Sequence, residues 1–186
     1  AIENIASGYL DLILETKDEK KKAEYRLNAD AVEGYLAERF ADSPNKLLMM
    51  AAGDATIRLA AKETQYKNPT SADRLYTAFF TNYRRHTTAA TLAAAKAMEM
   101  QKAERYDDAV KYWKIISECY TNTTFYAPSL AQLSYCSGKL GDKKAEIDYI
   151  TKYLAVETVK IRRLQAQFQL AQMYQKDGMA ILAAAA

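Results

Sequence analysis

Apolar residues recur at intervals of three and four positions along most of the chain. In two of these segments the apolar positions are Tyr76, Phe79, Phe80 and Tyr83, and then Val110, Trp113, Ile115 and Ile116. This spacing places the apolar side chains on one face of a helix. No segment shows the strict alternation that is typical of a half-buried strand, so the pattern predicts an all-α fold.

Turn-forming residues separate the helical segments at regular intervals. The breaks lie near residues 16–18, 42–44, 67–70, 85–87, 105, 120–123, 141–142, 157 and 177–178. All three prolines lie at or beside a break, as expected for a residue that can open a helix but disrupts its interior. We therefore predict about nine helices of roughly 12 to 22 residues, joined by short turns.

The helical segments repeat with a period of 37 residues. Ala72, Tyr76, Phe79 and Tyr83 return as Ala109, Trp113, Ile116 and Tyr120, and a looser copy follows at Ala145, Tyr149 and Tyr153. The segments between them also recur, because Leu133, Ser134 and the turn at Gly141 return as Leu170, Ala171 and Gly178. The repeating unit is therefore a pair of helices.

This unit resembles the tetratricopeptide repeat. The resemblance rests on Leu170, Ala171, Tyr174 and Gly178 for the first helix, and on the run from Tyr106 to Ala109 with Trp113 for the second. The chain departs from the family pattern in lacking the opening Trp, in placing Ala97, Ser134 and Ala171 at the usual glycine, in carrying Lys96 where Leu is expected, and in a stretch from Gly141 to Ala145 that is one residue short.

The resemblance implies a right-handed α-solenoid of antiparallel helix pairs. Residues 71–186 are expected to form repeats of about 37 residues, the last one incomplete. Residues 1–70 are expected to form N-terminal helices and a degenerate, longer repeat, because Phe40 and Tyr83 are 43 residues apart.

Composition adds bounds to this picture. The chain has 186 residues, 49% of them hydrophobic, a net charge of +3, and basic residues interleaved with acidic ones. Such a balance indicates neither a nucleic acid nor an anionic membrane as partner. No apolar run approaches the ~20 residues that span a bilayer. The first residue is not Met, so a leader or a lipidated cysteine before Ala1 and export from the cytoplasm stay open.

The residue types that carry catalysis do not form a recognisable set. Asp107 and Asp108 fit the first turn of a helix, where free N–H groups and the helix dipole favour carboxylates. The single histidine, His86, follows two arginines and is expected to be exposed in a loop. Cys119 and Cys136 are expected to be buried, free and poorly reactive thiols. We therefore predict no enzyme activity, no metal site and no cofactor.

The candidate partner-binding residues lie on the first helix of each pair, on the face that such repeats turn toward a groove. They are Met98, Lys102, Tyr135, Lys139, Phe168, Gln172 and Lys176, with Gln101, Gly138 and Gln175 beside them. Three of the lysines recur every 37 residues and would suit an acidic or C-terminal carboxylate ligand. The alternative is that a lysine near a helix C-terminus is simply solvated and favoured by the dipole.

These observations favour a non-enzymatic protein–protein interaction scaffold, whose partner is a protein or peptide segment that is acidic if the lysine row takes part. A nucleic-acid-associated regulator built on the same repeat is the alternative, and an enzyme or small-molecule binder is a third class. The final run MAILAAAA has no amphipathic face. It therefore predicts an uncapped last repeat that packs against another copy or a partner.

Two helix-end phrases are similar to those of bacterial cell-envelope repeat proteins, in the outer-membrane β-barrel assembly and Tol–Pal systems. They run from Tyr35 to Pro44 and from Tyr120 to Ala127, and only the first keeps the proline. The resemblance implies a scaffold in the bacterial periplasm or at the outer membrane, with a cytoplasmic adaptor as the alternative.

Overall fold

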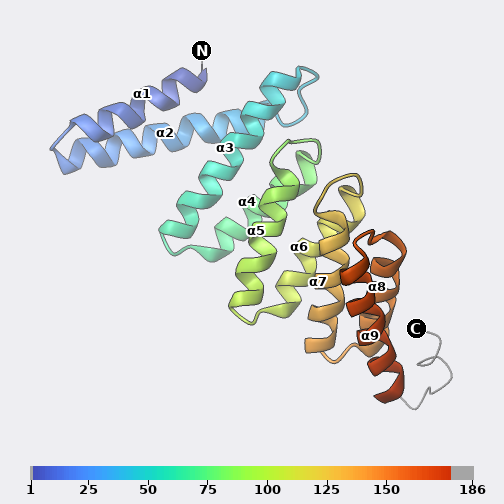
Figure 1. The fold of residues 1–186 in the computed structure, drawn as a ribbon. Helices are drawn as coiled ribbons and strands as arrows, with labels where there is room; N and C mark the ends of the chain where they lie inside the picture. Colours follow the sequence, from blue (N-terminus) through green and yellow to red (C-terminus); the bar gives the residue numbers. More distant parts are fainter. Residues whose placement is uncertain (1, 177–186) are drawn as a thin grey trace. The chain divides into compact units, whose positions relative to one another are not determined.

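The computed structural model describes residues 2–176, except for the side chains of residues 2–4, 6, 7, 10 and 176. Every regular element in this range is an α-helix (Figure 1). The helices are α1 (Ile2–Glu15), α2 (Glu19–Arg39), α3 (Lys46–Gln65), α4 (Pro69–Asn82), α5 (Ala89–Lys102), α6 (Tyr106–Cys119), α7 (Tyr126–Lys139), α8 (Lys143–Val156) and α9 (Lys160–Lys176). The predicted all-α fold is confirmed for this part of the chain.

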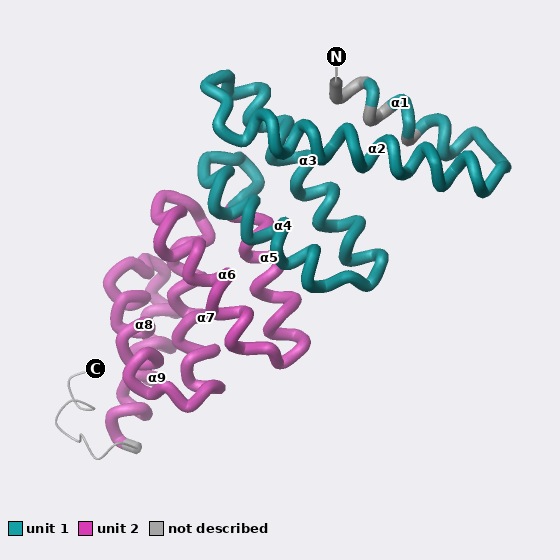
Figure 2. Tube along the Cα trace, turned by 180° about the vertical axis from the view of Figure 1, so that it is seen from behind, with its two compact units in different colours: residues 1–89 teal, residues 90–186 magenta. Residues whose placement is uncertain are grey.

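Neighbouring helices pack in series, in two compact units (Figure 2). The first unit extends to Ala89, and in it α1 packs on α2, α2 on α3 and α3 on α4. The second unit begins at Ala90, and in it α6 packs on α7, α7 on α8 and α8 on α9. Each unit is thus a helical-repeat-like stack in which a helix contacts the next one along the chain.

The 37-residue period is visible in the helices themselves. Helices α4, α6 and α8 have 14 residues each and begin at Pro69, Tyr106 and Lys143, each 37 residues after the one before. The turns ahead of them carry left-handed residues at the same spacing, namely Lys67 (φ 56°), Glu104 (φ 57°) and Gly141 (φ 76°). The period therefore extends to the turn between α3 and α4, although Phe40 and Tyr83, the residues compared across this repeat in the sequence, are 43 residues apart.

The copy of the repeat in α8 has a different register from the expected one. Ile150, which lies 37 residues after Trp113, is the buried residue at 3% exposure, whereas Tyr149 is only half-buried. The expected match of Tyr149 to Trp113 and the missing residue between Gly141 and Ala145 were therefore wrong. Tyr149 is aromatic like Trp113, which suggested the match. The buried position is instead the one at the same distance from the helix start, and α8 starts at Lys143.

The core of the first unit is a close contact between small residues of α3 and aromatic residues of α4. Ala52, Ala55 and Ala60 are fully buried in α3, and Phe79 is fully buried in α4. Alanines without bulky side chains let the two helices approach closely, and the rings of α4 fill the remaining space. Tyr83 at the end of α4 also donates its hydroxyl hydrogen to the carbonyl oxygen of Ala37, at 2.8 Å.

His86 is buried rather than exposed, which corrects the sequence interpretation. Its side chain is 1% exposed, and its ring contacts the ring of Phe79 edge-on with centroids 5.3 Å apart. Its Nδ1 lies 3.3 Å from the backbone nitrogen of Thr88, and its Nε2 lies 3.3 Å from both the carbonyl oxygen of Met50 and Oδ1 of Asp54. The residues that bury the ring come from α4 and from α3, and those of α3 are more than 30 positions away in the sequence.

Gly53 in α3 leaves the space that this imidazole occupies. A Cβ added at Gly53 would lie 2.6 Å from Cδ2 of His86 and 3.4 Å from Cε2 of Phe79. Both rings are buried and cannot move aside, so we expect Gly53→Ala to lower the free energy of unfolding by about 1–3 kcal/mol. Urea denaturation measures this loss.

Gly34→Ala is the matched control in the same unit, because Gly34 lies in α2 and nothing lies within 4 Å of a Cβ added there. Replacing a mid-helix glycine in open space with alanine raises stability by roughly 0.5–1 kcal/mol. Equal effects of the two substitutions would contradict the packing of His86 against Gly53.

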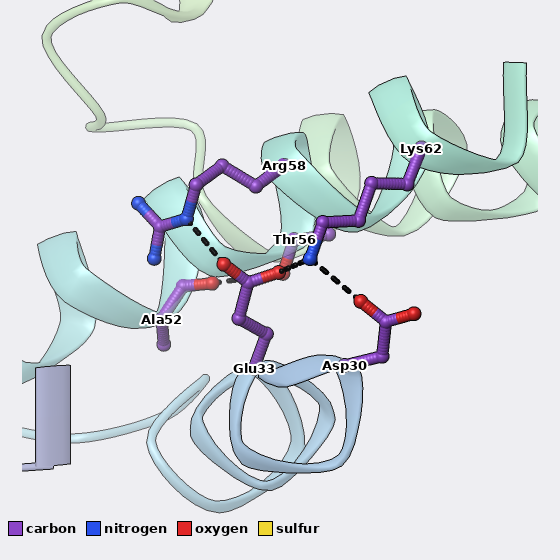
Figure 3. A network of polar contacts seen from close by, with 6 residues as sticks. All are labelled: Asp30, Glu33, Ala52, Thr56, Arg58 and Lys62. Carbon is purple, nitrogen blue, oxygen red and sulfur yellow. Dashed lines mark hydrogen bonds and ion pairs between the residues drawn. The ribbon is translucent and has the colours of Figure 1, made fainter. Parts of the chain in front are cut away.

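A network of ion pairs joins α2 to α3 (Figure 3). Glu33 of α2 is 1% exposed, and its carboxylate accepts from Nε of Arg58 at 2.7 Å and from Nζ of Lys62 at 3.0 Å. Lys62 also donates to Asp30 at 2.6 Å. Partial burial alone would lower the pKa of Lys62, but the hydrogen bonds to the two carboxylates outweigh it and raise that pKa.

The core of the second unit lies where α7, α8 and α9 meet. Its buried members are Leu130, Ile150, Tyr153, Ala166 and Leu170. The turn between α8 and α9 is fixed by one carboxylate: Glu157 accepts from the hydroxyl of Tyr153 at 2.6 Å and from the backbone N–H of Val159 at 2.8 Å. This arrangement sets the direction in which α9 begins.

The two cysteines lie in different environments. Both thiols are free, but Cys119 is exposed at the end of α6 and Cys136 is buried in α7. The expectation that both are buried was therefore wrong for Cys119, which is the last residue of its helix. Burial raises the pKa of the Cys136 thiol to about 11.

This difference predicts selective alkylation. The thiolate is the reactive form, so iodoacetamide at mildly alkaline pH should modify Cys119 in the folded protein and Cys136 only after denaturation. Mass spectrometry of the tryptic peptides measures both. Equal labelling of the two cysteines under native conditions would contradict the burial of Cys136.

Two further points bear on function. Within residues 2–176, none of the helices combines the length and the apolarity needed to cross a membrane. The predicted turn at Gly178 and the alanine-rich end lie outside the described residues.

Candidate functional site

The second unit contains an open hollow of about 590 Å3 between α7 and α9. Its lining consists of Ala131, Gln132, Ser134 and Tyr135 from α7, Glu146 from α8, and Gln169, Gln172 and Met173 from α9. The same two helices also supply Leu130, Leu133 and Leu170 to the buried core. The hollow is therefore held by helices whose apolar faces are already packed.

Carboxamides give the hollow its chemical character. Gln169 and Gln172 are exposed and Gln132 is half-buried, and each side chain both donates and accepts hydrogen bonds. Tyr135 adds a half-exposed ring at 49% exposure. Such a set of groups can pair with the N–H and C=O groups of an extended polypeptide.

One glutamine chain fixes the position of Gln132. Nε1 of Trp113 in α6 donates to Oε1 of Gln101 in α5, at 2.8 Å. Nε2 of Gln101 then donates to Oε1 of Gln132 in α7, also at 2.8 Å. The buried tryptophan thus orients the carboxamide of Gln132 through Gln101. Because Oε1 of Gln132 accepts this hydrogen bond, its Nε2 amide group is the part that can donate to a ligand.

The ring of Tyr135, which lines the hollow, is contacted by two residues outside the lining. The ring of Tyr135 meets the ring of Tyr106 edge-on, with centroids 6.1 Å apart. The ammonium of Lys139 lies 5.5 Å from the centre of the Tyr135 ring, within the range of a cation–π contact. Tyr135 is therefore held in place before any ligand arrives.

The charges at the hollow differ from those of the lysine row. The lining contains the carboxylate of Glu146 and no lysine or arginine. Lys102 and Lys139 lie in the last turns of α5 and α7, the position that the helix dipole favours for a cation. The side chain of Lys176 is outside the described part of the structure.

The structure brings together some of the candidate residues and separates others. Tyr135 and Gln172 both line the hollow, and Lys139 lies beside it. Met98 is 55% exposed on α5, and Phe168 is 65% exposed on α9 without being part of the lining. Gln101 bonds to Trp113 and Gln132, so its carboxamide serves the architecture.

Sequence reasoning missed several lining residues, although a signal was present. Gln132 and Gln169 are 37 residues apart, as are Tyr135 and Gln172. The period thus places two polar positions of each first helix in the same hollow. Glu146 had no such signal, because it reaches the hollow from the second helix of a pair.

The two adjacent carboxylates considered for catalysis lie at the start of a helix. Asp107 and Asp108 lie in the first turn of α6, as predicted. Asp108 accepts from Nζ of Lys111 at 2.7 Å and from Nη2 of Arg105 at 2.6 Å, and these bonds lower the pKa of its carboxyl group. In the part of the chain that the structure describes, no three His, Cys, Asp or Glu side chains converge as a cation site.

Comparisons with known proteins assign no family. No family model matches the chain. A search of the curated proteins likewise finds no relative.

Proposed function

We propose that this protein is a non-enzymatic scaffold that binds an extended segment of a partner protein in the hollow between α7 and α9. In this proposal the helix pairs form a solenoid of the tetratricopeptide-repeat type. The observation that carries it is the set of outward-facing carboxamides, Gln132, Gln169 and Gln172, beside the fixed ring of Tyr135.

The chemistry of the hollow favours a polypeptide main chain as ligand. A peptide in extended conformation presents alternating donors and acceptors, and carboxamides satisfy both. Met173 and the Tyr135 ring offer apolar contact for one or two side chains of the segment. An interface of this kind obtains register from hydrogen bonds and affinity from the aromatic anchor.

Lys102, Lys139 and Lys176 would extend the contact to acidic residues of the segment. Glu146 belongs to the lining and would repel acidic side chains of the partner. In this proposal the acidic residues of the segment therefore contact the three lysines, here called the lysine rim, and do not enter the hollow. A site of action in a bacterial cell-envelope assembly is part of the same proposal, and it rests on the helix-end phrases at Tyr35 to Pro44 and Tyr120 to Ala127.

Alanine substitutions in the hollow test this function. A partner is first identified by affinity capture and mass spectrometry, and the bound segment is then made as a labelled peptide. We expect Tyr135→Ala and Gln172→Ala each to weaken binding of this peptide by about tenfold or more, as for central anchors of an interface. Fluorescence anisotropy measures the dissociation constants.

Lys152→Ala is the control, because Lys152 pairs with Asp148 on the exposed side of α8 and does not line the hollow. Its affinity should equal that of the wild type. Unchanged affinity of both hollow variants would contradict the proposal. Replacing Lys102, Lys139 and Lys176 together by Glu separates the rim from the hollow: a loss that is large at low salt and small at moderate salt assigns the lysines a role in binding.

A further inference from the structure

Helix α9 carries a second apolar face, opposite to the one in the core. Ala166 and Leu170 are 3% and 6% exposed and pack in the core cluster of the second unit. Ile161, Leu164 and Phe168 are 64%, 53% and 65% exposed. At 3.6 residues per turn, these three side chains form one stripe on the side of the helix turned away from Leu170.

This stripe is a continuous feature and not a scatter of single exposed residues. Spacings of three and four residues place neighbouring side chains one above the other along the helix. The beginning of α9 is also rigidly placed, because Glu157 bonds to both Tyr153 and the backbone N–H of Val159. The stripe is therefore presented in a fixed orientation.

The charge around the stripe is of one sign. Lys160 flanks the stripe at the start of α9, whereas Arg163 lies seven residues before Leu170 and therefore on the opposite face. Residues 160–176 contain no Asp or Glu. Arg162 lies 4.0 Å from Glu157, whereas no ion pair joins Lys160 or Arg163 to another described residue. Cations at a helix N-terminus oppose the helix dipole, so they do not serve the stability of α9.

We propose that the stripe formed by Ile161, Leu164 and Phe168 binds an amphipathic helix of a partner protein, whose apolar face covers the stripe and whose acidic residues meet Lys160. None of the three apolar residues lines the hollow, although Gln172, one turn after Phe168, does. The inference rests on the residues of the stripe and not on those of the hollow.

The distribution of charge decides among the occupants. A second copy of the chain, packed α9 against α9, would bring like charges together and offer no carboxylate in exchange. A helix that lies on an anionic membrane carries Lys and Arg along its polar flanks. Here the cations lie at the two ends of α9, and the flank between them is formed by glutamines, among them Gln165 and Gln172. Glutamine flanks suit hydrogen bonding to a protein.

The test uses the full chain and two synthetic helical peptides. Both peptides have leucine along one face, and their flanks carry glutamate in one and lysine in the other. We expect the glutamate peptide to bind, more weakly as salt is raised, and the lysine peptide not to bind. Ile161→Glu and Phe168→Glu should weaken binding by at least about tenfold. Lys160→Glu should weaken binding of the glutamate peptide and strengthen binding of the lysine peptide.

Lys152→Ala is the control, since Lys152 pairs with Asp148 on the exposed side of α8 and does not belong to the stripe. Circular dichroism and melting verify that each variant folds, and substitutions at exposed positions should leave both unchanged. Failure to bind the glutamate peptide, or equal binding of both peptides, overturns the proposal. So does binding of phosphatidylserine vesicles in place of the peptide, self-association that Phe168→Glu abolishes, or peptide binding that appears only after residues 177–186 are removed.

Discussion

Phe79→Ala should lower the free energy of unfolding of the first unit by about 3–5 kcal/mol, the range for removing a buried aromatic ring. Phe79 is fully buried, and its ring contacts those of Phe80, Tyr83 and His86 at centroid distances of 5.3, 5.7 and 5.3 Å. The substitution removes all three ring contacts at once and leaves a cavity. The neighbouring rings cannot close it, because each is fixed by other contacts, as Tyr83 is by its bond to Ala37.

Chemical denaturation followed by circular dichroism measures this loss. Phe168→Ala makes the same change in side chain at a position that is 65% exposed, and it should change stability by no more than about 0.5 kcal/mol. A loss below about 1 kcal/mol for Phe79→Ala would mean that these rings are not the centre of the unit.

Removal of both cations from the network between α2 and α3 should cost a similar amount. In the double variant Arg58→Ala, Lys62→Ala, the carboxylate of Glu33 stays buried at 1% exposure without a cation beside it. A buried charge that loses its partners destabilises a protein by about 3–5 kcal/mol. Thermal and urea unfolding of the double variant measure the effect.

A triple variant distinguishes the stranded charge from loss of packing. Adding Glu33→Leu to the double variant removes the carboxylate and supplies an apolar side chain between the helices. Replacement of a buried ion network by apolar residues is often neutral or stabilising, so the triple variant should regain most of the lost stability. A triple variant no more stable than the double variant would assign the loss to the missing stems of Arg58 and Lys62.

Much of the fold could be predicted from the sequence, because its signals are local. Helix spacing and the prolines depend on residues within one or two turns of one another, and the 37-residue recurrence can be read along the chain without knowledge of tertiary contacts, so together they located the helix pairs. His86 was misjudged for the opposite reason. Its neighbours in the sequence are Arg84 and Arg85, but the residues that bury it are Met50, Gly53 and Phe79.

Glu33 shows a second limit. Helix α2 has many charged residues and no clear apolar face, so nothing in its sequence separates Glu33 from its exposed neighbours. Its burial depends on Arg58 and Lys62, 25 and 29 residues away. At the candidate site the period placed Tyr135 and Gln172 together, but the contribution of Glu146 depended on how the second helix lies against the first.

The turns at Lys67, Glu104 and Gly141 also divide this part of the chain into segments of equal length. Because residues 105–141 begin after one left-handed residue and end at the next, that segment is one full period of the repeat, or one module. A gene duplication that copies it whole would lengthen the protein by one helix pair and leave the register of every other helix unchanged. An insertion of any other length would shift the following apolar faces away from their neighbours. Growth and loss of whole modules is therefore the route by which proteins of this architecture can change length while keeping their fold.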